Sequence, residues 1–84
     1  MYILIGDIGN TVTKICLCKT ANLEIKKIIY INSNKIYSVF NLNKILKKFL
    51  KNKKINKFSL FSSVVPKYEF LMAFYLKKFY KIEL

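Results

Sequence analysis

The sequence predicts an α/β fold with a mixed sheet, in which the elements follow the order β-β-β-α-β-α-β. Two observations predict it. In residues 1–34 the apolar residues form three short runs separated by turn-forming residues, as in an antiparallel meander. From residue 38 onward the apolar period lengthens to that of a helix, and one short apolar run lies between two helical segments. The length of 84 residues suits one small domain or a piece of a larger protein.

The three strands of the meander are predicted at residues 2–7, 11–19 and 23–31. The first is continuously apolar from Tyr2 to Ile5, which is typical of a central strand covered on both faces. The second and third alternate more loosely between apolar and polar residues. Turns are predicted at residues 20–22 and 32–34, because Asn and Ser side chains bond to nearby backbone.

The second half of the chain predicts two helices and two strands. Apolar residues at helical spacing predict a helix after Ser38, a plausible N-cap, and it ends before the break at residues 52–54. A strand at 57–61 follows a helix and is therefore expected to run parallel to the first strand. Pro66 starts the second helix at a position that tolerates proline, and this helix is predicted to end at Lys77 and Lys78. Residues 80–84 are predicted to begin a fifth strand.

The chain is strongly basic, with a formal net charge of +12. All 16 basic residues are lysines, and Lys, Ile and Asn together supply 36 of the 84 residues. This bias is typical of a very AT-rich genome, in which Lys replaces Arg wherever a surface cation suffices. Proteins that read nucleic acids favour the forked guanidinium group of Arg, so we expect a solvated lysine-rich surface and no nucleic-acid partner.

Cys16 and Cys18 lie two positions apart on a predicted strand and are expected to share one face as small core residues. The chain has no His and no further Cys to complete a zinc site. No window of about 18 residues is free of charge, so we expect no membrane span. No basic leader precedes the first strand, and a cytoplasmic location is the expectation.

Rare residues gather at the end of the first predicted strand. Asp7 is the only aspartate, and the two glycines, Gly6 and Gly9, lie beside it between two apolar runs. A strand, a glycine-bearing turn and a second strand allow the backbone to come close to a ligand. An aspartate at that point is well placed to meet a metal ion or a metal bound to phosphate.

The run Ser62-Ser63-Val64-Val65-Pro66 follows the fourth predicted strand. A meander followed by α-β-α-β is the order of the ribonuclease H-like fold, in which the first and fourth strands are neighbours. Ligands of open α/β sheets bind at the carboxyl ends of the strands, so this run is expected to share a crevice with the segment around Asp7. A purely structural interpretation also stays open, in which these residues only form turns, strand ends and a helix cap.

The run Asp7-Ile8-Gly9-Asn10-Thr11 resembles the first phosphate motif of the acetate kinase, sugar kinase and actin superfamily. The Asn in this run narrows the resemblance to the type III pantothenate kinases. The run at residues 62–66 is similar to a second hallmark of that family and lies at the matching distance of about 50 residues. The resemblance extends over residues 1–84. It implies an N-terminal ribonuclease H-like lobe that binds ATP phosphates within a two-lobed, actin-like kinase.

The resemblance implies ATP-dependent phosphorylation of pantothenate to 4'-phosphopantothenate, in coenzyme A biosynthesis. It further implies a homodimer, a divalent metal such as Mg²⁺, and potassium or ammonium. In it, Asp7 acts on the metal or its waters, while Asn10 and Thr11 donate hydrogen bonds to phosphate oxygens. Such groups suit phosphoryl transfer, which depends mostly on positioning and charge neutralisation. The implied phosphate loop consists of Asp7, Ile8, Gly9, Asn10, Thr11, Val12, Thr13 and Lys14.

The family's general base, an aspartate in a Gly-x-Asp-Arg stretch, has no counterpart in the 84 residues, and neither does the second lobe. We therefore expect no catalytic residue in this chain and little or no turnover by it alone. Glu24, Glu69 and Glu83 are expected to be solvated. Two alternatives stay open: another small-molecule kinase of the superfamily, and a non-catalytic regulator or binding module built on the same lobe.

Overall fold

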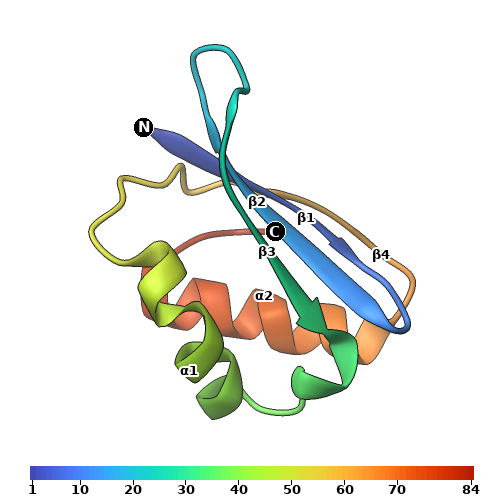
Figure 1. Cartoon of the computed structure of the whole chain (residues 1–84). Coiled ribbons are helices and arrows are strands. Elements are labelled where there is room, and N and C mark those ends of the chain that lie inside the picture. Colours follow the sequence, from blue (N-terminus) through green and yellow to red (C-terminus); the bar gives the residue numbers. More distant parts are fainter.

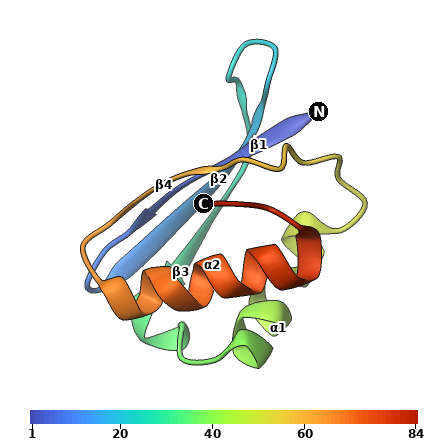
Figure 2. The ribbon, with the colours of Figure 1, turned by 180° about the vertical axis from the view of Figure 1, so that it is seen from behind.

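The computed structural model describes residues 1–84 and consists of one sheet with both α-helices on the same face (Figure 1; Figure 2). None of its helices is long and apolar enough to cross a membrane. The elements in chain order are β1 (Tyr2–Ile8), β2 (Val12–Lys19), β3 (Ile25–Asn32), the short 3₁₀ helix η1 (Ser33–Lys35), α1 (Val39–Leu50), β4 (Leu60–Ser63) and α2 (Pro66–Tyr80).

The sheet has four strands in the order β3-β2-β1-β4. β1 and β2 pair antiparallel, as do β2 and β3, so the predicted meander is confirmed. β4 pairs parallel to β1, as expected for a strand that follows a helical crossover. The α/β fold class and the order of the first six predicted elements are therefore confirmed.

The core lies between the sheet and the two helices. Strand residues two apart and helix residues three or four apart supply its buried side chains, as the two apolar periods predict. The core members from the strands and the two α-helices are Leu4, Ile8, Ile15, Leu17, Ile31, Leu42, Leu46, Phe49, Leu50, Met72, Tyr75 and Leu76.

Both α-helices begin where the sequence predicts. The Oγ of Ser38 accepts a hydrogen bond from the N–H of Asn41 at 3.0 Å and caps α1. Pro66 is the first residue of α2. This helix ends at Tyr80, two residues past the predicted end at Lys78. It ends there because Lys81 takes the left-handed conformation (φ 57°) and its N–H donates to carbonyls of the last turn.

Three strand predictions need correction. β4 spans Leu60–Ser63 and not residues 57–61, so Ser62 and Ser63 lie inside the strand and do not follow it. The side chain of Asn56 accepts a hydrogen bond from the N–H of Phe58 and bends the chain before the strand. β3 starts at Ile25 and not at residue 23, because the preceding turn holds a residue at positive φ. The predicted fifth strand is reduced to one parallel bridge between Phe58 and Glu83.

Gly6 lies inside β1, as the strand predicted at residues 2–7 implies, and its surroundings explain why it has no side chain. It pairs in register with Phe61 of β4. A Cβ atom at Gly6 would lie 2.2 Å from the Cε2 atom of Phe61, so the aromatic ring occupies the space that a side chain would need. The missing side chain at this position makes room for the Phe61 ring.

The substitution Gly6→Ala should lower the free energy of unfolding by about 1–3 kcal/mol, because the new methyl group displaces the Phe61 ring. In a domain of this size each kcal/mol lowers Tm by about 4–8 °C, which thermal unfolding followed by circular dichroism resolves. In a Phe61→Leu background the same substitution should cost less. An equal loss in the two backgrounds would show that the ring is not the obstacle.

Tyr75 connects the two α-helices from inside the core. Its side chain is fully buried, and its hydroxyl donates a hydrogen bond to Oδ1 of Asn43 at 3.1 Å. Burial, and to a lesser extent the neighbouring hydroxyl of Tyr80, raises the pKa of Tyr75 well above the ordinary tyrosine value. The folded protein therefore keeps this phenol neutral at a pH at which the unfolded chain ionises it.

Above about pH 10 the unfolded chain releases the Tyr75 proton and the folded chain retains it, so the free energy of unfolding falls as the pH rises. Tyr75→Phe should flatten this fall in urea unfolding measured between about pH 9 and 11. It should also cost about 1 kcal/mol at neutral pH, since Asn43 loses its donor. The matched control is Tyr30→Phe, the same chemical change at an exposed tyrosine of β3. A Tyr75→Phe slope equal to that of the unmodified chain would contradict the assignment.

Candidate functional site

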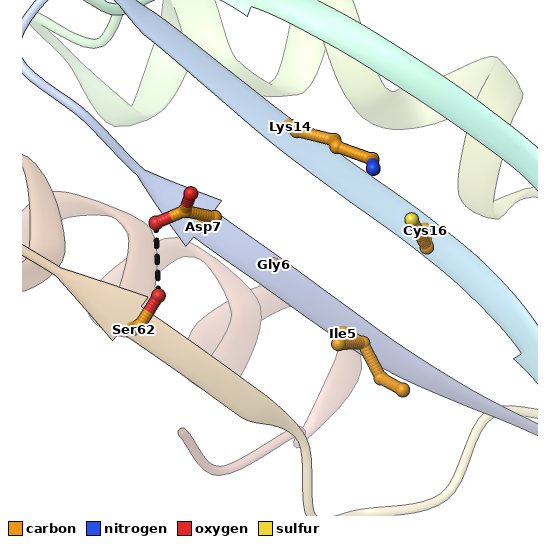
Figure 3. A pocket seen from close by; sticks show the side chains of 6 residues that line it. All are labelled: Ile5, Gly6, Asp7, Lys14, Cys16 and Ser62. Carbon is orange, nitrogen blue, oxygen red and sulfur yellow. Dashed lines mark hydrogen bonds between the residues drawn. The ribbon is translucent and has the colours of Figure 1, made fainter.

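The sheet face opposite the helices carries polar side chains at the carboxyl ends of β1 and β4. Asp7 of β1 pairs in register with Ser62 of β4 and, on its other side, with Lys14 of β2. The Oγ of Ser62 donates a hydrogen bond to Oδ1 of Asp7 at 2.8 Å (Figure 3). The structure thus brings together the two segments that the strand order predicts to share a crevice.

A hollow of about 310 Å³ opens on this face beside Asp7. Its lining combines polar and apolar residues, a combination that suits the binding of a small ligand. Figure 3 shows the side chain of Lys14 extended along β2, while Asp7 leans toward β4. Asp7 takes part in neither of the two ion pairs of the chain, Lys19–Glu24 and Lys77–Glu83. The residues that line the hollow are Ile5, Gly6, Asp7, Lys14, Cys16 and Ser62.

Ser63 has a different role from Ser62. Its Oγ accepts a hydrogen bond from the N–H of Val65 at 3.2 Å and also lies 3.3 Å from the carbonyl of Val65. The side chain of Ser63 thus shapes the turn from β4 into α2 and does not join Asp7. Of the two serines that the sequence singles out, the structure brings only Ser62 to the carboxylate.

The turn between β1 and β2 consists of Gly9, Asn10 and Thr11. The N–H of Gly9 donates to the carbonyl of Val12 at 3.1 Å, and a Cβ atom on Gly9 would lie 2.8 Å from that same oxygen. Only glycine fits this close backbone approach. Asn10 and Thr11 are exposed at the tip of the hairpin.

The other residues of the predicted phosphate loop belong to strands. Ile8 and Thr13 are fully buried, so their side chains point into the core and offer a ligand nothing. Val12 and Lys14 are exposed on β2. The loop that the resemblance implies is therefore a short turn held between two strands.

Two polar residues beside the turn between β1 and β2 could not be identified from the sequence. Asn32 ends β3 and Asn34 lies in η1, and together with Asn10 and Thr11 they line a hollow of about 450 Å³ whose four lining residues are all polar. The only signal for them is the turn predicted at residues 32–34. That prediction places them on the surface but not beside the hairpin tip.

The two cysteines are free, buried thiols, as predicted. They lie on the sheet face opposite the helices, where Cys16 pairs in register with Ile5 and Cys18 with Ile3. Burial, and to a lesser extent the thiol of Cys16, raises the pKa of Cys18. The Cys18 thiol therefore stays protonated near neutral pH, which makes it a poor nucleophile and a poor metal ligand.

The protein ligands available around Asp7 determine which metal ion could bind there. No three His, Cys, Asp or Glu side chains gather in this chain in a way that could hold a metal ion. Asp7 offers a single carboxylate, and Ser62 already donates to one of its oxygens. A zinc site would require more protein ligands. Mg²⁺ commonly binds one or two protein carboxylates together with substrate phosphates and waters, so the residues present fit that ion.

Comparison with known proteins identifies the family of this chain. The family model of the type III pantothenate kinases matches residues 3–84. A curated type III pantothenate kinase from Pelagibacter ubique (strain HTCC1062) is 47% identical to the chain over 81 residues. This match covers 96% of the chain and 32% of the relative, so the chain spans about a third of the relative's length. The chain belongs to the type III pantothenate kinase family.

Proposed function

We propose that this chain is the ATP-phosphate-binding lobe of a kinase that phosphorylates pantothenate to 4'-phosphopantothenate. The observation that carries the proposal is the contact of Asp7 with Ser62 next to the exposed turn of Asn10 and Thr11. These groups lie at the carboxyl ends of two parallel neighbouring strands, where open α/β sheets bind their ligands.

In this proposal Asp7 holds the divalent metal or its waters. Mg²⁺ would supply charge neutralisation at the phosphates, which is the main requirement of phosphoryl transfer. Ser62 fixes the direction of the carboxylate by donating to Oδ1, so one carboxylate oxygen stays available. The arrangement is pre-organised, because both side chains project from paired strands of the sheet.

The turn supplies the hydrogen-bond donors for phosphate oxygens. Asn10 and Thr11 are exposed and each carries a side-chain donor as well as a backbone N–H. Lys14 adds a positive charge from the neighbouring strand, and no carboxylate of the chain pairs with it. In this proposal the turn binds the anion and Asp7 binds the cation that accompanies it.

The proposal also assigns different roles to the two lobes. Residues 1–84 form the first lobe, and a second lobe supplies the general base and most contacts to pantothenate. The family resemblance adds a homodimer, a monovalent cation and a cytoplasmic location, and we assign the monovalent cation to no residue of this chain. Neither a nucleic acid nor a membrane is needed as a partner.

A chimera tests the proposal. The chain replaces the aligned segment of the Pelagibacter ubique relative, and ATP consumption is measured with and without pantothenate. We expect consumption only when pantothenate is present. Asp7→Asn should lower the rate at least about 100-fold, because the amide cannot hold the metal in place of the carboxylate.

The matched control is Glu69→Gln, the same chemical change at an exposed carboxylate in the first turn of α2. It should leave the rate unchanged. An Asp7→Asn chimera that consumes ATP at the rate of its parent would contradict the role of Asp7 in metal binding. A parent chimera that folds but consumes no ATP would instead favour a non-catalytic binding module.

A further inference from the structure

Ser33 has a hydrogen-bond partner for each of its polar groups although it is fully buried. It is the first residue of η1, directly after β3. Its N–H donates to the carbonyl of Thr11 at 2.8 Å, and its Oγ donates to the carbonyl of Gly9 at 2.7 Å. Its own carbonyl accepts from the N–H of Ile36 at 2.9 Å. Two of these contacts reach the turn between β1 and β2.

Thr13 completes the network. Its Oγ1 lies 2.8 Å from the Oγ of Ser33, and both side chains are fully buried. A serine hydroxyl has one proton, and that of Ser33 goes to Gly9. Thr13 must therefore be the donor in the contact between the two hydroxyls. The two hydrogen bonds therefore point the same way, from Thr13 to Ser33 and from Ser33 to the carbonyl of Gly9. Consecutive hydrogen bonds of this kind strengthen each other.

This network determines which backbone groups the turn leaves available. The carbonyls of Gly9, Thr11 and Val12 all accept hydrogen bonds from within the protein. The N–H groups of Asn10 and Thr11, by contrast, donate to no protein acceptor. A phosphate oxygen is attracted by N–H groups and repelled by carbonyl oxygens. Ser33 thus ties back the carbonyls of Gly9 and Thr11, which leaves the two N–H groups and the carbonyl of Asn10 as the unbonded backbone groups of the turn.

We propose that Ser33, held in place by Thr13, is a positioning residue for triphosphate binding. It contacts no ligand itself, since it is buried, and it acts by fixing the turn at Gly9 and Thr11. This inference rests on the proposed function of the same site and adds residues to it that the phosphate motif does not contain. Without the serine hydroxyl, the carbonyl of Gly9 is free to rotate toward the ligand.

The chain itself, 84 residues with its hairpin, serves for the test. The first variant is Ser33→Ala, which removes the hydroxyl that bonds to the turn. The second is Thr13→Val, which keeps the side-chain volume and removes the hydroxyl that donates to Ser33. Thr13→Ser keeps the hydroxyl and should behave as the unmodified chain. The matched control is Ser59→Ala, because the buried Ser59 also donates its Oγ to a backbone carbonyl, that of Glu83, at 2.8 Å.

Two measurements separate positioning from stability. The first is the affinity for Mg²⁺–ATP, followed by nuclear magnetic resonance titration, and the second is the backbone order parameter at Asn10 and Thr11. We expect Ser33→Ala and Thr13→Val to weaken ATP binding about 3- to 10-fold, the effect of one buried hydrogen bond. The order parameter of the turn should fall from about 0.85 to below about 0.6. Ser59→Ala should change neither quantity.

Equal affinity and equal order in Ser33→Ala and the unmodified chain would overturn the inference. An equal loss of affinity in Ser33→Ala and Ser59→Ala would also overturn it, because both would then act through stability alone. If the unmodified chain binds no ATP while the turn still loosens in Ser33→Ala, the proposed ligand fails and the structural role of Ser33 stands. The two proposals are therefore distinguished by the same set of samples.

Discussion

The parallel pairing of β1 with β4 is the constraint on which the rest of the structure depends. It joins positions that are 55 residues apart in the chain, Asp7 and Ser62, through a direct side-chain hydrogen bond. The same register places Phe61 against Gly6, so one pairing fixes the packing on one face of β1 and the polar contact on the other. A shift by one residue would exchange these two faces and separate the carboxylate from its donor.

Much of this arrangement could be predicted from the sequence, because hydrophobic periods and rare residues carry the information. The change from short apolar runs to helical spacing identifies the meander and the crossover helix. Asp7 stands out as the only aspartate of a lysine-rich chain. Once the strand order is known, the neighbourhood of Asp7 and Ser62 follows from topology alone.

The remaining features depend on contacts that have no local signature. Ser33 resembles an ordinary turn residue, yet its hydroxyl bonds to a carbonyl 24 residues away. Thr13 follows the alternation of β2, and its role becomes visible only when β3 is placed beside it. The sequence pattern misplaces the boundaries of β3, β4 and α2 by two or three residues for a similar reason. Single side-chain contacts and positive φ values decide where these elements begin or end.

The bonds from Ser33 have a thermodynamic consequence for the hairpin tip. Fixing the backbone of one residue costs about 1–2 kcal/mol of conformational entropy at room temperature. Because the tip is tied to η1 in the folded chain, this cost is met during folding and not when a ligand arrives. Association with an already ordered tip should therefore have a less unfavourable entropy than association with a loop of the same sequence. The polar hairpin behaves in this respect as part of the rigid sheet.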